Sequence, residues 1–338
     1  MSTVVAIAIT VLPICLFLGA LVLIDSYKLV APRAVLLSVL AGIVVGLVSY
    51  GANVWLRPAL EMTLSAYSRY VAPLVEETLK GTWVVYLLAR SRIGFVVDAG
   101  ILGFAVGTGY ACLENLYYLQ DPTATLWTWF VRGFGTAVMH GGTTAIFAMV
   151  ARSLHRLSGR VRPHLLLPGL LAAVVLHSLY NHFIVQPLLA TALIMLVFPY
   201  TAMTIFQRSE RDTRSWLGSG FDTDQELLLA MRAGHMSETP VGKYLATVRS
   251  RFSPEVIVDM MCLLRLRAEL GIRAKGLLMM REAGFDAAPP SAAVGDTFVE
   301  LRYLEKSVGR TGMLALQPFI HTSTRDLWQL NLLGEKRK

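Results

Sequence analysis

Residues 34–56 read AVLLSVLAGIVVGLVSYGANVWL, a stretch that contains no charged side chain. A helix of about 20 apolar residues is long enough to cross the hydrocarbon core of a bilayer, which is about 30 Å thick. Further segments share this length and apolar character, although polar residues interrupt some of them. We therefore predict a bundle of about seven spans, at residues 4–24, 34–56, 66–89, 94–119, 126–151, 165–185 and 187–206.

The composition favours the same class of protein. Hydrophobic residues make up 54% of the chain and charged residues 16%, whereas soluble domains have about 25% charged residues. Residues 1–206 hold 12 Lys/Arg and 7 Asp/Glu, while residues 207–338 hold 19 and 16. No strand pattern is evident, so we predict an all-α chain with a transmembrane domain over 1–206 and a C-terminal cytoplasmic helical domain over 207–338.

The positive charges of the short loops predict the orientation, since Lys and Arg collect on the cytoplasmic side. Eleven lie on one side of the predicted spans, from Lys28 to Arg214, and only Arg57 and Arg69 on the other. We predict a multi-pass protein of the cell membrane with its N-terminus outside. The segment at 4–24 lacks a basic start and a cleavage site, so we expect a retained span.

The tail after residue 207 reads as amphipathic helices separated by Gly and Pro. One helix is expected over 222–233, and another is expected to begin at Ser253-Pro254-Glu255 and to end near Leu270, before Gly271. Residues 283–294, which contain two prolines, are expected to be a linker. The tail's charges nearly balance, at 19 positive and 16 negative, so a nucleic-acid partner is not expected.

Polar groups interrupt four successive predicted spans, from 66–89 to 165–185. A charged group at mid-bilayer costs about 2.5–3.5 kcal/mol on insertion scales, and such groups usually serve a function. Lys80 is able to reach either Glu76, four residues before it, or Glu77, three residues before it, and a single Glu–Lys pair is explained by structural pairing alone. Clusters on four helices favour a functional site. The groups are Glu76, Glu77, Lys80, Glu114, Asn115, Arg132, His140, His177, Asn181 and His182.

The set of groups suits the activation of water and its attack on a carbonyl. A glutamate shielded from water is a stronger base, and an imidazole or amide stabilises a developing oxyanion. We expect Glu76 to be the base, with Glu77 close behind as a candidate, and no Ser or Cys nucleophile motif competes with them. The candidate catalytic residues are Glu76, Glu77, Lys80, Glu114, Asn115, His140, His177 and Asn181.

At these residues the sequence resembles the PrsW family of intramembrane proteases, relatives of the CAAX prenyl-protease and bacteriocin-processing superfamily. The similarity covers about residues 60–190, and its order along the chain makes it specific. The matching motifs are Glu76-Glu77-x-x-Lys80, Tyr110-x-x-x-Glu114-Asn115, His140 and His177-x-x-x-Asn181. Tyr110 stands where we would expect Phe. The resemblance implies site-specific cleavage of membrane-associated proteins, such as an anti-sigma factor in regulated proteolysis.

Alternative functions stay open at this stage. We expect no cofactor, yet Glu76, Glu114, His140 and His177 are alternative ligands for zinc. The local His-Glu-x-x-His pattern of many zinc proteases is missing. A proton-coupled transporter or a non-catalytic membrane regulator also uses buried polar groups. The expected partners are membrane lipids and a membrane protein substrate, and the sequence leaves the oligomeric state open.

Overall fold

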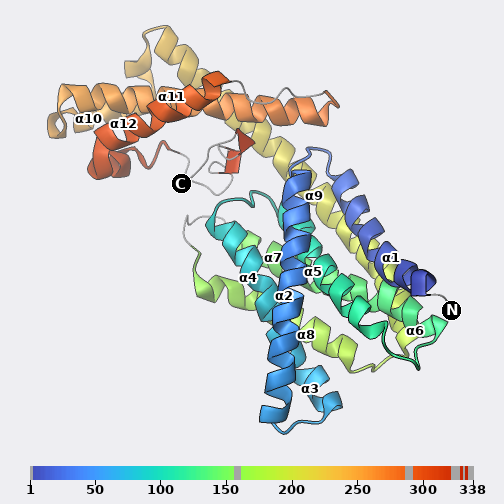
Figure 1. Cartoon of the computed structure of the whole chain (residues 1–338). Coiled ribbons are helices and arrows are strands. Elements are labelled where there is room, and N and C mark those ends of the chain that lie inside the picture. The colour runs from blue at the N-terminus through green and yellow to red at the C-terminus, as the bar shows by residue number, and fades with distance from the viewer. Residues whose placement is uncertain (1–2, 156–160, 286–291, 321–327, 330–331, 334–338) are drawn as a thin grey trace. The chain divides into compact units, whose positions relative to one another are not determined.

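The computed structural model describes residues 3–155, 161–285, 292–320, 328–329 and 332–333. Within these ranges the chain is helical and contains no strand, which confirms the all-α prediction. The chain divides into two compact units, Met1–Glu210 and Arg211–Lys338. Each unit is described by itself (Figure 1).

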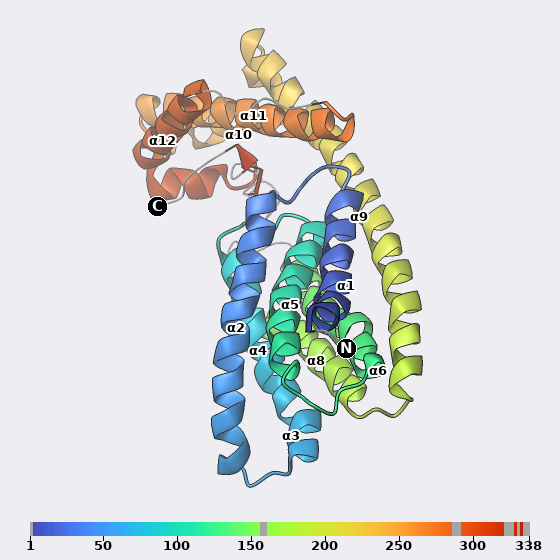
Figure 2. The ribbon, with the colours of Figure 1, turned by 45° about the vertical axis from the view of Figure 1, so that its right-hand side comes forward.

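The first unit is a bundle of long helices. Its elements are α1 (Thr3–Ile24), α2 (Pro32–Ala59), α3 (Leu64–Tyr70), α4 (Ala72–Ala89), α5 (Val96–Tyr118), α6 (Leu126–Phe130), the π-helical turn η1 (Val131–Thr136), α7 (Ala137–Leu154), α8 (Pro163–Asn181) and the start of α9 (Pro187–Arg232). Figure 2 shows α1, α2 and α5 running alongside one another.

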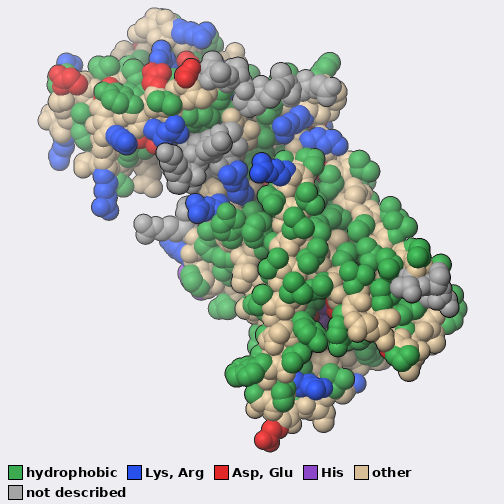
Figure 3. Space-filling view, in the orientation of Figure 1, with side chains coloured by type: hydrophobic (Ala, Val, Ile, Leu, Met, Phe, Trp, Pro, Cys, Tyr) green, Lys and Arg blue, Asp and Glu red, His purple; other side chains and the backbone are tan. Residues whose placement is uncertain are grey.

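Six helices of the described chain are long and apolar enough to cross a membrane: Val4–Ile24, Pro32–Ala59, Val96–Tyr118, Leu126–Leu154, Pro163–Asn181 and Pro187–Arg232. In the orientation of Figure 3, hydrophobic side chains are spread over the face of this first unit. The chain is therefore a multi-pass membrane protein. The remaining predicted span, 66–89, is not among the six because Glu76, Glu77 and Lys80 reduce the hydropathy of α4.

The predicted span 66–89 is also divided into two helices. Helix α3 ends at Tyr70 and α4 begins at Ala72, with Val71 between them. Pro73 stands in the first turn of α4. Backbone N–H groups there have no partner within the helix, so a proline, which has no N–H, costs the helix no hydrogen bond. The carboxylates therefore lie in the first turns of a new helix, which contacts α2, α5, α7 and α8.

Helix α5 is the most enclosed of the six long apolar helices, since 83% of its most apolar 18-residue stretch is buried. Glycines allow its neighbours to approach its backbone closely, as is common between membrane helices. A Cβ atom at Gly109 would lie 1.9 Å from the carbonyl oxygen of Val39 on α2. A Cβ atom at Gly107 would lie 2.3 Å from the carbonyl oxygen of His140 on α7. This close approach positions His140 against α5.

The second unit is a small helical domain with its own core. It contains the end of α9, the short turns η2 (Met236–Glu238) and η3 (Arg249–Arg251), and the helices α10 (Pro240–Val248), α11 (Pro254–Glu282) and α12 (Ala292–Leu316). Most of its buried residues come from α10, α11 and α12, and they include Leu245, Met260, Leu263, Phe298 and Leu301. Helices α11 and α12 pack against each other.

Two tail predictions are wrong in their bounds. No separate helix forms over 222–233, because α9 continues without interruption to Arg232. The helix that begins after Ser253 does start at Pro254, as predicted, but it passes through Gly271 to Glu282. Gly271 does not end the helix because its missing side chain makes room for Asp224, whose Oδ2 lies 2.6 Å from the position of a Cβ atom.

The predicted linker 283–294 is shorter than expected, because α12 begins at Ala292. Part of that segment, 286–291, lies outside the described residues.

Candidate active site

The carboxylate of Glu77 lies at the centre of a buried polar cluster. Its Oε1 receives Lys80 Nζ at 2.5 Å, His177 Nδ1 at 2.8 Å and the Thr143 hydroxyl at 3.1 Å. Glu77 and Lys80 are 2% and 0% exposed. Because all three donors meet one oxygen, Oε2 of Glu77 has no hydrogen-bond partner among the described residues. Such a buried acceptor calls for a water molecule or a cation.

Lys80 links this carboxylate to the histidine of α7. Its Nζ lies 3.2 Å from His140 Nδ1 and 4.7 Å from the centre of the Tyr110 ring. His140 itself is 2% exposed, and its ring stands 4.8 Å from that of His177 in an edge-to-face arrangement. The ammonium group therefore touches a carboxylate, an imidazole and an aromatic face at once, which fixes its place.

Glu114 holds the opposite side of the His140 ring. Its Oε2 lies 2.8 Å from His140 Nε2, and its Oε1 lies 3.3 Å from Arg132 Nη2. Arg132 projects from the π-helical turn η1, and its guanidinium stacks 3.7 Å above the Tyr118 ring. A π-helical turn is rare and is frequent at functional sites. Here it brings a cation to the carboxylate that orients His140.

Glu76 is the less restrained of the two adjacent carboxylates. Its Oε1 accepts a hydrogen bond from Asn53 Nδ2 at 3.2 Å, and Asn53 is in turn held by the Tyr67 hydroxyl at 2.8 Å. Its Oε2 faces His177 Nε2 at 3.8 Å, beyond hydrogen-bond distance. No Lys or Arg lies within ion-pair distance of Glu76 in the described residues, and this imidazole is the basic group that faces it.

Glu76, His140 and His177 form a group that is able to hold a metal ion. Each offers one ligand atom, and these atoms all lie within 4.8 Å of one another. Two imidazoles and one carboxylate are a known ligand set of catalytic zinc sites. The second nitrogen of His177 is held by Glu77, an arrangement that fixes the ring and its tautomer in metal sites.

The structure brings together six of the eight predicted site residues: Glu76, Glu77, Lys80, Glu114, His140 and His177. Among the described residues, neither asparagine side chain forms a hydrogen bond with these six. Asn115 Nδ2 donates to the Thr10 carbonyl on α1, and its Oδ1 accepts from Arg132. Asn181 Nδ2 donates to the Ser68 carbonyl on α3 at 2.9 Å.

Three contacts of this cluster were not included among the predicted site residues. Thr143 lies three residues after His140, one helical turn away, so the spacing offered a signal. Arg132 was noted as a buried charge, but the sequence does not show that it meets Glu114. Asn53 is a single amide in the second predicted span, and only the packing of α2 against α4 brings it to Glu76.

Comparison with known families accounts for this arrangement. A family model described as "PrsW family intramembrane metalloprotease" matches residues 27–205, more than half of the chain. The matched range contains every residue of the cluster. Neither a comparison with curated proteins nor one with solved structures finds a match. The buried Glu and His groups all lie within the matched range, and the chain belongs to the PrsW family of intramembrane peptidases.

Proposed function

We propose that this peptidase cleaves membrane-anchored protein substrates with water activated between Glu76, His140 and His177. The observation that carries the proposal is the convergence of these three side chains, from α4, α7 and α8, to within 4.8 Å. The three residues lie in a buried part of the bundle, where electrostatic interactions are stronger than in water. Peptide hydrolysis needs a base for water and donors for the oxyanion, and this group supplies both.

The contacts favour Glu76 over Glu77 as the carboxylate that meets the water. Glu77 already accepts hydrogen bonds from Lys80, His177 and Thr143, so we assign it to positioning His177 and neutralising the charge of Lys80. Glu76 has only neutral partners, the Asn53 amide and the Tyr110 hydroxyl, and an open side toward His177. A general base must lie within hydrogen-bond reach of the proton that it removes, and Glu76 has the free oxygen for this.

The donor set fits a zinc ion held by Glu76, His140 and His177. When bound, zinc lowers the pKa of a coordinated water and polarises a carbonyl. The chain's own residues prepare such a site: Glu77 holds Nδ1 of His177 and leaves Nε2 toward Glu76. Both nitrogens of His140 have partners, Lys80 at Nδ1 and Glu114 at Nε2, so a zinc ion would bind this ring by taking the place of one of these contacts.

Other residues take supporting roles in this proposal. Glu114 orients His140, and Lys80 balances the charge of Glu77. Asn115 anchors α5 to α1 through the Thr10 carbonyl. Asn181 would reach the oxyanion by exchanging its present hydrogen bond to the Ser68 carbonyl.

An apolar groove supports a membrane-spanning substrate. It has a volume of about 750 Å³ and lies between α7, α8 and the first part of α9. Thr143 is one of its lining residues, and the same hydroxyl donates to Glu77. Thr143 therefore lies between the groove and the polar cluster, and the groove suits a transmembrane segment of the substrate. We propose an anti-sigma-factor-like protein of the cell membrane as the first substrate class to test.

The test uses the full chain reconstituted in vesicles with a panel of single-span proteins. We expect mass spectrometry to find cleavage at a peptide bond in or beside the span. The zinc content per chain, together with activity after chelation and after zinc return, separates the metal-dependent form of the mechanism from the metal-free form. Flux of protons or solutes without cleavage of any substrate would refute the proposal and favour a transporter.

A further inference from the structure

The second unit contains a cavity that the family match does not cover. Its volume is about 240 Å³, and it lies among α9, α11 and the residues after α12. All of its lining residues belong to Arg211–Lys338, outside the matched range 27–205. Pockets for drug-sized ligands span about 300–1,000 Å³, so this cavity suits a small metabolite.

A partly buried ion pair forms part of the cavity wall. Lys275 Nζ lies 2.6 Å from Asp224 Oδ2, and Lys275 is 4% exposed. The same ammonium lies 5.6 Å from the centre of the Trp216 ring. Burying two charges is expensive even when they are paired. Because this pair borders a cavity, its charged atoms are available to a ligand that enters the cavity.

Two further side chains of the wall have polar atoms without partners. Gln329 is 8% exposed, and its Oε1 has no hydrogen-bond partner among the described residues. Nε of Arg267 also has no hydrogen-bond partner among the described residues, although Nη2 of the same side chain donates to Glu305 Oε1 at 2.6 Å. Buried polar atoms are nearly always satisfied. The wall therefore offers one spare acceptor and one spare donor.

Glycines make room for the charged groups. A Cβ atom at Gly271 would lie 2.6 Å from Asp224 Oδ2 and 3.7 Å from Gln329 Nε2. A Cβ atom at Gly220 would lie 2.7 Å from Lys275 Nζ. Any larger residue at these positions would displace the polar groups. Both glycines occur inside long helices, where glycine is unfavourable by about 1 kcal/mol relative to alanine.

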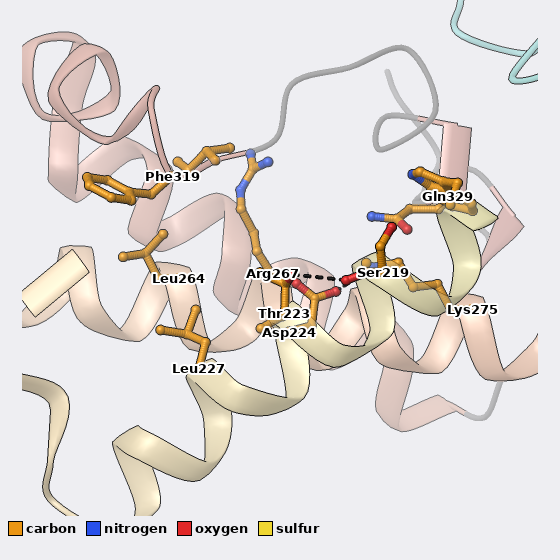
Figure 4. Close-up of a pocket in the computed structure, with 13 residues that line it drawn as sticks. Ser219, Thr223, Asp224, Leu227, Leu264, Arg267, Lys275, Phe319 and Gln329 are labelled. Carbon is orange, nitrogen blue, oxygen red and sulfur yellow. Dashed lines mark hydrogen bonds and ion pairs between the residues drawn. The ribbon is translucent and has the colours of Figure 1, made fainter. Parts of the chain in front are cut away.

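The cavity has an apolar side and a polar side. Figure 4 shows Leu227, Leu264 and Phe319 together on one side, and Lys275 and Gln329 on the other. Arg267 stands between the two groups (Figure 4). A cation, an anion, a spare acceptor and a spare donor beside an apolar wall are complementary to a small zwitterion that carries an apolar group.

We propose that this cavity binds a free α-amino acid with an apolar side chain. Its carboxylate would accept hydrogen bonds from Lys275 and from Nε of Arg267. Its ammonium group would donate to Asp224 and to Oε1 of Gln329, so both orphan atoms gain a partner. Its side chain would pack against the apolar side of the cavity.

The experiment is isothermal titration of the full chain in detergent with L-leucine. Two analogues test the assignment of charges: 4-methylpentanoate lacks the ammonium group and isoamylamine lacks the carboxylate. We expect L-leucine to bind and each analogue to bind about tenfold more weakly or less, since a charge-assisted hydrogen bond is lost. No heat of binding for leucine, or equal binding of either analogue, would overturn the proposal.

Matched variants locate the site. Gly271→Ala places a methyl group against Asp224, whereas Gly276→Ala on the same helix meets no atom within 4 Å. We expect the first to abolish leucine binding and the second to preserve it. Gln329→Leu, with thermal unfolding checked, should weaken binding about tenfold without a steric change. Equal binding by all three variants would overturn the site. Glu76→Gln should bind leucine normally, because the cavity and the hydrolytic centre belong to different units.

Discussion

The ion pair between Glu77 and Lys80 allows the energetics of the polar cluster to be tested by a double-mutant cycle. Lys80 is fully buried and Glu77 is 2% exposed, and their atoms lie 2.5 Å apart. Removing one partner of a buried pair leaves an uncompensated charge and destabilises a protein by about 3–5 kcal/mol. Replacing both with neutral side chains of similar volume is often nearly neutral.

The structure refines this magnitude for each variant. In Lys80→Met, Glu77 keeps the donors of His177 and Thr143, so we expect a loss near the lower limit, about 3 kcal/mol. In Glu77→Gln, Lys80 loses its opposite charge and keeps only neutral neighbours, which are the amide oxygen, Nδ1 of His140 and the face of Tyr110, so the loss should be larger, up to about 5 kcal/mol.

The double variant removes both charges and should recover most of this stability, so its loss should be well below the sum of the two single losses. The assay is reversible unfolding in mixed detergent micelles, followed by circular dichroism. The control is Arg90→Met, which removes an exposed positive charge directly after α4 and should change stability by less than about 0.5 kcal/mol. Small and additive effects of the two single changes would refute the reasoning.

Three further predictions concern separate parts of the fold. Gly107→Ala places a methyl group 2.3 Å from the carbonyl oxygen of His140, so we expect a lower melting temperature and slower cleavage together. Thr143→Val removes one donor to Glu77 and should lower the free energy of unfolding by about 1 kcal/mol in the micelle assay. Ser253→Ala removes the cap of α11 and should destabilise the second unit by about 1 kcal/mol, measured by hydrogen exchange, with cleavage unchanged.

Each of these predictions has a control or an outcome that contradicts it. Gly51→Ala and Gly276→Ala meet no atom within 4 Å and should not lower stability. Normal cleavage by Gly107→Ala would contradict the close packing of α5 on α7. An unchanged stability of Thr143→Val would show that its hydroxyl adds nothing to Glu77. Unchanged exchange in α11 after Ser253→Ala would show that the cap is not needed.

The sequence predicted the helical class and the polar cluster for a physical reason. Charged groups in apolar segments are costly, so Glu76, Glu77 and Lys80 stand out against their surroundings without knowledge of the packing. The spacing allowed Lys80 to reach either Glu76 or Glu77, and in the structure it lies 2.5 Å from Glu77. Local signals of this kind depend on one helix only.

Other features depend on contacts between distant segments, and the sequence did not reveal them. Only packing shows that Glu77 meets His177 and Thr143 while Glu76 stays free toward His177. The helix end expected before Gly271 was wrong because Asp224, 47 positions earlier, occupies the space of the missing side chain. The tendency of glycine to end a helix describes an isolated segment, and a tertiary contact overrides it here.

The central claim is that Glu76 belongs to the hydrolytic centre formed with His140 and His177. The most direct measurement is the single-turnover rate of cleavage of one single-span substrate in vesicles by the wild-type chain, by Glu76→Gln and by Glu61→Gln. Glu61 is an exposed residue in the turn after α2 and serves as the control. The account predicts a loss of about 10²–10⁴-fold for Glu76→Gln and none for Glu61→Gln. Cleavage by Glu76→Gln at the wild-type rate would contradict it.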